Sequence, residues 1–220
     1  MPTRSRTVAL ATTFALSTVL TLGAVAQAGT TKLVRDIEPN GSSTPVGFQG
    51  MKGKIYFSAR TDAYGRELWK SDGTWKGTKL VRNIAPGTAG SEPSDLTHVQ
   101  GTMFFVASTP QTGRELWKTD GTWKGTKLVR DILPGPGGSR PYDLTGYKGK
   151  LYFLSQSGSG PTQLWKSDGT RAGTKLVKRI ATVDAPDVPW LQRAGGLLYI
   201  NGHDRTHGME LWRSDGTPKG

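Results

Sequence analysis

The 220-residue chain contains no cysteine, so the sequence excludes disulfide bonds, thiol nucleophiles, cysteine-ligated zinc and iron–sulfur clusters. Histidine is scarce, with three residues, and acidic residues are few, with 17 Asp and Glu against 29 Lys and Arg. The net charge of +12 favours polyanionic partners, among them acidic polysaccharide, teichoic acid, anionic lipid and nucleic acid. Because many of the lysines recur with a repeat, a dispersed, solvated basic surface is the simpler interpretation, and nucleic acid is not an expected partner.

The first 28 residues differ in character from the rest of the chain. Arg4 and Arg6 precede a largely apolar run from Val8 to Val25, and Ala26-Gln27-Ala28 has the small–x–small form of a signal-peptidase site. We therefore expect a signal peptide over residues 1–28, and a secreted or cell-envelope-associated mature chain over residues 29–220 that has no membrane span. The alternative is a retained membrane anchor, which the serines and threonines in the apolar run disfavour.

One phrase of about twenty residues is written four times. It reads GRELWKSDGTWKGTKLVRNI from Gly65, GRELWKTDGTWKGTKLVRDI from Gly113 and PTQLWKSDGTRAGTKLVKRI from Pro161, and the fourth copy is GMELWRSDGTPKG. The tryptophan that follows the leucine recurs at spacings of 48, 48 and 47 residues. A strict period of this length predicts a repeat architecture.

Each period contains four strand-like runs separated by glycine, proline and aspartate. In the second period these runs are SDLTHVQ, TMFFVAS, RELWKT and TKLVRDI, here called A, B, C and D. Run B is apolar throughout and needs cover on both faces, which face-to-face stacking of small antiparallel sheets provides. The sequence therefore predicts an all-β chain, a β-propeller with four blades of four antiparallel strands.

The repeat also predicts how the four blades would close into a ring. The mature chain begins with the D-type run TTKLVRDI and ends after a C-type run, and its 192 residues equal four units of 48. We expect Thr31–Ile37 to complete the last blade by pairing with Met209–Ser214. The alternative is a segment of a longer array, which would give the same ends.

The phrase ELWKSDGTWKGTKLVRNI resembles the ELWxxDGT-repeat family of exported bacterial proteins built from tandem propeller-type repeats. Three copies keep ELW, whereas the third has Gln163 in place of glutamate, and all four keep DGT. The resemblance covers nearly the whole mature chain. It implies a fold and an export route, and no reaction.

Two sets of repeated residues are expected to be structural. One large tryptophan per unit is expected to pack between blades, and one aspartate per unit is expected to form a turn with its own backbone. Sugar stacking by the tryptophans and calcium binding by the aspartates are the alternatives, the second weakened because each loop offers a single carboxylate. The residues are Trp69, Trp117, Trp165 and Trp212, and Asp72, Asp120, Asp168 and Asp215.

Variation between copies gathers in the B–C loops and the D–A links, which share one end of an up-and-down sheet. Loops on a rigid scaffold commonly carry binding sites, although neutral drift would give the same pattern. We expect a composite binding face there, made of Tyr64, Arg140, Tyr142, Trp190, His203 and Arg205. His203 and His207 lie in a loop by pattern, so no metal site and no cofactor are expected.

The expected function is surface binding or adhesion by an exported protein without catalytic residues. The expected partner is a polysaccharide, a cell-surface polyanion or another protein. The alternatives are a propeller enzyme that acts on glycans as a lyase or hydrolase, and a structural segment of a longer repeat array. An enzyme would need clustered carboxylates, for which the sequence offers only Asp184 and Asp187 in one link.

Overall fold

A computed structural model describes residues 31–156, 160–180 and 189–220, and the expected signal peptide lies outside these ranges. The chain separates into two units, Met1–Lys32 and Leu33–Gly220, and every strand belongs to the second. The described residues form strands and turns, which confirms the all-β prediction. In this part of the chain no helix is long and apolar enough to cross a membrane.

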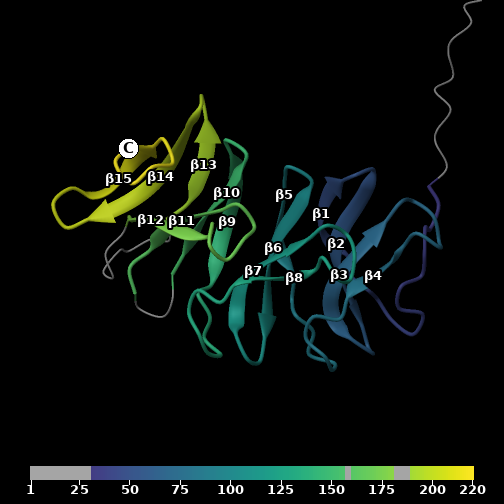
Figure 1. Ribbon diagram of the computed structural model, residues 1–220. Helices are drawn as coiled ribbons and strands as arrows, with labels where there is room; N and C mark the ends of the chain where they lie inside the picture. The colour runs from purple at the N-terminus through teal and green to yellow at the C-terminus, as the bar shows by residue number, and fades with distance from the viewer. Residues whose placement is uncertain (1–30, 157–159, 181–188) are drawn as a thin grey trace, which may run out of the picture. The chain divides into compact units, whose positions relative to one another are not determined.

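The strands of Leu33–Gly220 form successive antiparallel sheets, one for each sequence repeat (Figure 1). In the first three sheets the strands pair in chain order, as predicted for runs A to D. The first sheet contains β1 (Val46–Met51), β2 (Lys54–Thr61), β3 (Gly65–Ser71) and β4 (Lys79–Arg82); the second contains β5 (Ser94–Val99), β6 (Thr102–Thr109), β7 (Gly113–Thr119) and β8 (Lys127–Arg130). The third contains β9 (Pro141–Tyr147), β10 (Lys150–Ser155), β11 (Gln163–Ser167) and β12 (Lys175–Arg179); the fourth contains β13 (Leu191–Ala194), β14 (Leu197–Asp204) and β15 (Gly208–Ser214).

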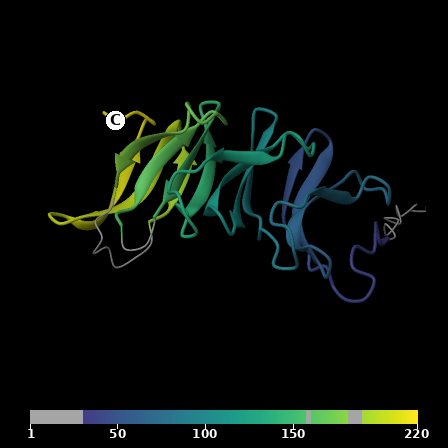
Figure 2. The same cartoon turned by 60° about the horizontal axis from the view of Figure 1, so that its bottom comes forward.

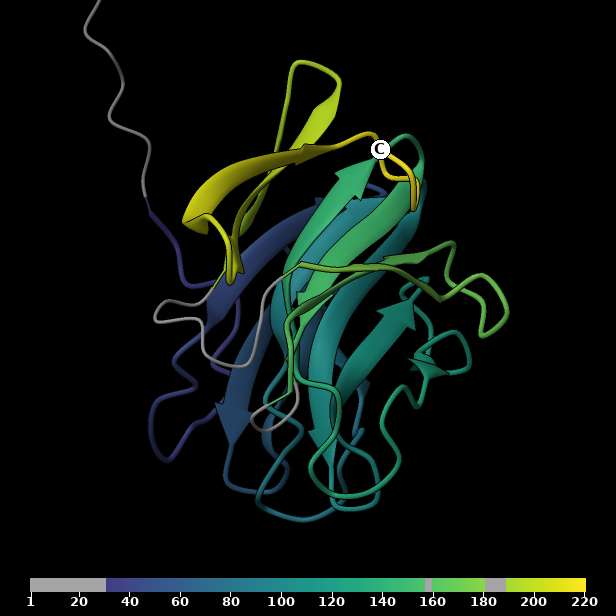
Figure 3. The ribbon, with the colours of Figure 1, turned by 90° about the vertical axis from the view of Figure 1, so that its left-hand side faces the viewer.

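The sheets follow one another in succession (Figure 2). The core lies between consecutive sheets, because the central strands are apolar on both faces. Met51, Tyr56 and Leu68 of the first sheet share a cluster with Phe105 and Trp117 of the second. Equivalent clusters join the second sheet to the third and the third to the fourth. Viewed along the succession, the sheets overlie one another (Figure 3). Up-and-down sheets stacked face to face in chain order are the arrangement of propeller blades.

The repeated tryptophans pack between sheets as expected, with one exception. Trp69, Trp117 and Trp165 are 6%, 8% and 9% exposed, whereas Trp212 is 39% exposed. In the first three sheets a leucine of the D strand lies directly opposite the tryptophan, in the pairs Trp69–Leu80, Trp117–Leu128 and Trp165–Leu176. Trp212 has no such partner strand among the described residues, which explains its exposure.

The expected ring closure is not found in this structure. Residues 31–37 form no strand, and the fourth sheet has three strands in the described part of the chain. Ile37 packs instead on the outer face of the first sheet, against Phe57 and Trp69. None of the core clusters of the described residues joins the fourth sheet to the first.

Candidate functional site

The turn between the C and D strands has the same rigid structure in the first three repeats. Asp72 Oδ1 accepts hydrogen bonds from Thr74 N at 3.0 Å and Thr74 Oγ1 at 2.7 Å, and Thr74 Oγ1 accepts one from Gly77 N at 2.9 Å. The hydrogen bonds from Thr74 lower the pKa of Asp72. The turn is closed at its base by Ser71 Oγ and Thr78 Oγ1, which lie 2.6 Å apart. The aspartate therefore forms the turn expected from the sequence.

Gly77 is needed in this turn for space rather than for a reversal of the chain. A β-carbon at position 77 would collide with the Asp72 carboxylate, and Gly77 does not have a positive φ. The second glycine of the repeat therefore makes room for the aspartate.

Each of the first two C–D turns presents an exposed tryptophan. Trp75 is 63% exposed and Trp123 is 61% exposed, although both belong to a chain rich in buried aromatics. The guanidinium carbon of Arg35 lies 4.7 Å from the centre of the Trp75 ring, and that of Arg82 lies 4.5 Å from the centre of the Trp123 ring. A cation over the ring face contributes about 0.5–1 kcal/mol at an exposed site, so it favours one orientation of each indole while most of the side chain stays in water.

The same arginines connect neighbouring repeats. Arg35 donates to the carbonyl oxygen of Thr78, and Arg82 makes the equivalent contact with the carbonyl oxygen of Thr126 in the next repeat. Arg130 donates to the carbonyl oxygen of Thr174 at 2.7 Å. The exposed indoles are thus built on turns that are bonded to the preceding repeat, so the turns are fixed relative to the sheets.

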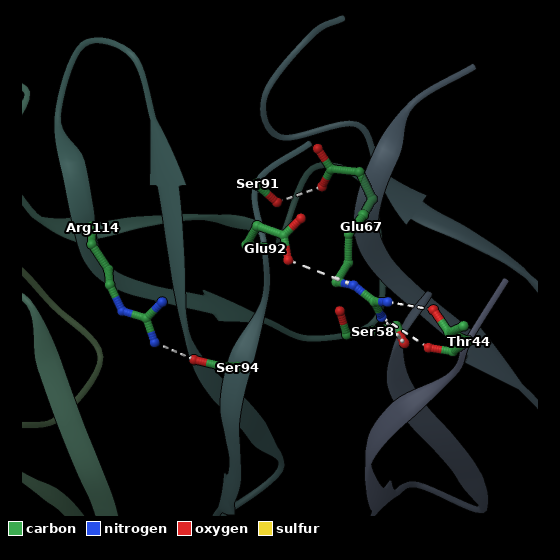
Figure 4. A network of polar contacts seen from close by, with 8 residues as sticks. Thr44, Ser58, Glu67, Ser91, Glu92, Ser94 and Arg114 are labelled. Carbon is green, nitrogen blue, oxygen red and sulfur yellow. Dashed lines mark hydrogen bonds and ion pairs between the residues drawn. The ribbon is translucent and has the colours of Figure 1, made fainter. Parts of the chain in front are cut away.

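At the opposite end of the sheets, a buried glutamate joins the C strand to the D–A link (Figure 4). Glu67 is fully buried; Ile84 N and Ala85 N donate to its Oε1 at 3.1 and 3.0 Å, and Ser91 Oγ donates to its Oε2 at 2.6 Å. Burial raises the pKa of Glu67, and the hydrogen bonds oppose that shift only in part. Three donors from one link therefore hold the loop in place.

The second repeat builds the same arrangement around Glu115. Leu133 N and Ser139 N donate to Glu115 Oε1 at 3.0 and 2.8 Å, and Ser139 Oγ donates to Oε2 at 2.6 Å. Burial again raises the pKa of the carboxyl group. In the third repeat Gln163 stands at this position, and its Oε1 accepts a hydrogen bond from Trp165 Nε1 at 3.0 Å. The link that follows it, residues 181–188 with Asp184 and Asp187, lies outside the described residues.

The B–C turns and D–A links do lie together, as the sequence predicted. Ser91 N donates to the carbonyl oxygen of Arg66 at 3.0 Å, and a β-carbon on Gly65 would collide with the backbone around Gly90. Two arginines at this end are engaged with neighbouring loops: Arg66 Nη1 donates to the carbonyl oxygen of Thr44 at 2.9 Å, and Arg114 Nη2 donates to Ser94 Oγ at 2.6 Å (Figure 4).

The six residues of the expected binding face differ in solvent exposure and in packing. Tyr64 is 40% exposed in the β2–β3 turn of the first sheet, and Arg140 is exposed immediately before β9. Tyr142 is partly buried and packs against the cluster between the third and fourth sheets, where burial raises the pKa of its hydroxyl group. Its position favours a packing role over ligand contact.

The remaining three residues belong to the fourth sheet. Trp190 is 46% exposed, and its backbone N–H donates to Asn201 Oδ1. His203 and Arg205 lie at the end of β14 and in the turn that follows it. In the same turn Asp204 accepts hydrogen bonds from the backbone of Thr206 and from His207, and the His207 bonds lower the pKa of Asp204 to about 2. No group of three metal-binding side chains occurs in the described ranges.

A groove with a volume of about 390 Å³ lies between the third and fourth sheets. Most of its lining surface is apolar, from Leu164, Ile180, Ile200 and Trp212. The polar side chains that line it include Lys178, Arg179, His203, Asp204 and Arg213. The groove runs beside β15, whose Leu211 is 66% exposed. The structure thus offers two candidate binding regions besides the expected face: the exposed indoles and this groove.

Sequence reasoning missed the exposed indoles and the buried glutamates. The repeated DGTW was a usable signal, because a tryptophan next to a tight turn lies outside the strands that build the core. The exchange of glutamate for Gln163 in the third copy was a signal that this position bonds to something other than the sheet.

The sequence matches no protein-family model and no curated protein. Among solved structures, the chain is similar to Bacteroides ovatus xyloglucan PUL GH43B, with 18% identity and a TM-score of 0.43 over 81% of this chain and 40% of that one. It is also similar to a GH43 endo-arabinanase from Bacillus licheniformis, with 17% identity and a TM-score of 0.44 over 81% and 73% of the two chains. A third is an alpha-L-arabinofuranosidase from Clostridium thermocellum, with 17% identity and a TM-score of 0.42 over 78% and 68%. The chain thus spans less than half the length of the first of these proteins, and similarities of this size do not identify a reaction or a substrate for it.

Proposed function

We propose that the protein is an exported, non-enzymatic repeat protein, of the ELWxxDGT type, that binds polysaccharide through the indoles of Trp75 and Trp123. The observation that carries the proposal is the exposure of these two side chains, 63% and 61%, on rigid turns of identical design. Exposed tryptophans on a flexible loop would lose conformational freedom on binding. Here the arginine contacts and the aspartate turns have already fixed the geometry, which favours affinity.

An indole suits a sugar ring for physical reasons. The apolar C–H face of a pyranose or furanose packs on the flat ring, and the hydroxyl groups at its rim stay available to water and to polar side chains. Lys76 and Lys124 follow the two tryptophans directly in sequence and are exposed, so an acidic sugar would gain charge contacts as well. Because the two sites repeat on successive sheets, they suit a polymer better than a single small molecule.

The alternative location of the binding site is the expected binding face formed by the B–C and D–A loops. It would serve a protein partner or a cell-surface polyanion through Tyr64, Arg140, His203 and Arg205. The exposed indoles lie at the other end of the sheets, because in an antiparallel sheet the C–D turn is opposite the B–C turn. The two locations can therefore be tested separately.

The test is a glycan-array screen of residues 29–220, at low and high salt, with three chains compared. The double variant Trp75→Ala/Trp123→Ala is expected to bind about tenfold more weakly than the wild type, if each stacking contact contributes about 0.5–1.5 kcal/mol as aromatic pairs do. The matched control is Trp190→Ala, an exposed tryptophan on the loop face, which should bind normally. Far-ultraviolet circular dichroism confirms that each variant keeps its strands.

Three results would contradict the proposal. Loss of binding in Trp190→Ala alone would place the site on the loop face. Binding to many acidic glycans that disappears with salt would leave only non-specific attraction. Shortened glycans, or products with a new double bond, would support the alternative of a propeller hydrolase or lyase.

A further inference from the structure

The C–D turn of the third repeat has the hydrogen bonds of the first two turns but a different side chain at its tip. Asp168 Oδ1 accepts hydrogen bonds from Thr170 N at 2.8 Å and Thr170 Oγ1 at 2.7 Å, and Thr170 Oγ1 accepts one from Gly173 N at 2.9 Å. Arg171, which is exposed, occupies the position that an exposed tryptophan has in the other two turns. The third turn therefore presents a guanidinium group where the others present an indole.

A second arginine reaches the same turn from the preceding repeat. Arg130 donates to the carbonyl oxygen of Thr174 at 2.7 Å, the contact that the corresponding arginines make in the first two turns. Those arginines lie 4.7 and 4.5 Å from the centre of an exposed indole ring, whereas the nearest ring to Arg130 is that of the buried Trp165, at 5.8 Å. Two guanidinium groups at one turn thus replace a pair of guanidinium and indole. Like charges repel, and an anion held by both groups relieves that repulsion.

The surroundings of this turn are strongly basic. Between Asp143 and Asp184 the sequence has one acidic residue, Asp168, and seven basic residues: Lys148, Lys150, Lys166, Arg171, Lys175, Lys178 and Arg179. The hydrogen bonds from Thr170 lower the pKa of Asp168, and the nearby charge of Lys150 adds to this shift. The single carboxylate is therefore committed to the turn and to a neighbouring lysine, and it does not neutralise the remaining positive charge.

We propose that the polysaccharide bound by the exposed indoles is acidic, and that Arg171 and Arg130 bind a carboxylate or sulfate group of it. This inference rests on the proposed function and names the class of polymer. A guanidinium group presents paired N–H donors in one plane, which match two oxygens of a carboxylate or sulfate group. Because the tip of the turn recurs once per sheet, one polymer chain would meet Trp75, Trp123 and Arg171 in succession.

A neutral polymer fits the third turn less well. The first two turns carry their exposed charge one residue after the tip, at Lys76 and Lys124, whereas the third has Ala172 there and carries its charge at the tip itself. The position that would contact a sugar ring in the other turns is therefore the charged one in this turn. Covering a guanidinium group with a neutral sugar removes water from the charge and supplies no opposite charge in return.

The test compares polymers that differ only in charge, by isothermal titration with residues 29–220. Polygalacturonic acid is paired with its full methyl ester, and dextran sulfate with dextran. The wild type is expected to bind the acidic member of a pair about tenfold more tightly, and Arg171→Ala to lose about tenfold on that member alone, as for one charge-assisted contact. Arg171→Trp, which gives this turn the residue of the other two, should bind neutral polymer more tightly and acidic polymer less tightly. The pair that shows the preference distinguishes carboxylate from sulfate.

The matched control is Arg60→Ala, which removes the same charge from the end of β2, at the opposite end of the sheets. Arg60 and Arg171 are both exposed, so both variants should keep the fold. Equal weakening by Arg60→Ala and Arg171→Ala would reduce the preference to net charge and overturn the arginine site.

The Trp75→Ala/Trp123→Ala variant separates this inference from the proposed function. Equal binding of charged and neutral polymers by the wild type, lost in the double variant, would overturn the acidic class and leave the indole site standing. Normal binding of acidic polymer by the double variant, lost in Arg171→Ala, would contradict the indole site and leave the arginine site standing. A wild type that binds none of the four polymers would overturn the inference.

Discussion

At the scale of the single residue, the glutamate of the ELW motif has the most specific role. Glu67 bonds a segment that begins 17 residues later in the chain, through Ile84, Ala85 and Ser91. The partners are two backbone N–H groups and one hydroxyl group, and a backbone N–H has no sequence signature. The sequence therefore showed that the position is repeated, and could not show which loop it holds.

We expect Glu67→Ala to destabilise the chain by about 3 kcal/mol, since it leaves buried donors without an acceptor. Glu67→Gln should cost clearly less, because its carbonyl oxygen can still accept from Ile84 and Ala85. Urea unfolding of the two variants beside wild type measures the difference. Equal losses would mean that shape alone, and not the acceptor, matters at this site.

Because the pKa of Glu67 is raised, the difference in stability between Glu67→Gln and the wild type should change with pH in a direction that can be stated in advance. A carboxyl group whose pKa is higher in the folded than in the unfolded chain binds its proton more tightly when folded, so its contribution to stability falls as the pH rises from about 4.3 through the folded pKa. Glutamine does not titrate there. The stability deficit of Glu67→Gln relative to wild type should therefore shrink as the pH rises through that window; a deficit that grows would contradict the assigned shift.

At the scale of the element, the sequence predicted where the strands lie better than it predicted which of their side chains are buried. The runs TMFFVAS and RELWKT have the residues that strands require, and the structure has strands there, β6 over Thr102–Thr109 and β7 over Gly113–Thr119. Burial of a tryptophan, in contrast, depends on whether another strand lies over it. The motif is the same at Trp117 and Trp212, and only the neighbouring strand makes one of them 8% and the other 39% exposed.

The two tryptophans should therefore differ in their energetic value. Trp117→Ala is expected to cost about 3–5 kcal/mol, the range for a large buried aromatic side chain. Trp212→Ala should cost less than half as much at a protein concentration where the chain is monomeric, because its ring already meets water. Chemical unfolding of both variants under one set of conditions checks this. A cost for Trp212→Ala as large as that for Trp117→Ala would show that β15 is covered in solution.

At the scale of the whole unit from Leu33 to Gly220, each sheet shares core clusters with its neighbours in sequence. Stability in such repeat arrangements is close to a sum of terms for the units and for the contacts between neighbours. The period of the sequence was enough to predict this succession of sheets. Closure was not predictable in the same way, because it depends on the angle between successive sheets, which no residue pattern encodes directly.

The rate of amide hydrogen exchange should differ between the second and fourth sheets. Amides of β14 and β15 are expected to exchange faster than those of β6 and β7, since the fourth sheet has three described strands and the second has four, with neighbours on both faces. Exchange measured by mass spectrometry on dilute protein provides the comparison. Equal protection of the two hairpins would argue that the fourth sheet gains a further strand.

An arginine follows the KLV run at Arg35, Arg82 and Arg130, and its hydrogen bond has a consequence for how such chains change in length. Arg82 and Arg130 bond to a backbone carbonyl oxygen of the next repeat, at Thr126 and Thr174, and not to a side chain peculiar to one copy. This hydrogen bond therefore requires no matched side chain in the repeat that follows. Duplication of one 48-residue unit, for example Lys79–Thr126, would recreate the Arg82–Thr126 hydrogen bond at the new junction.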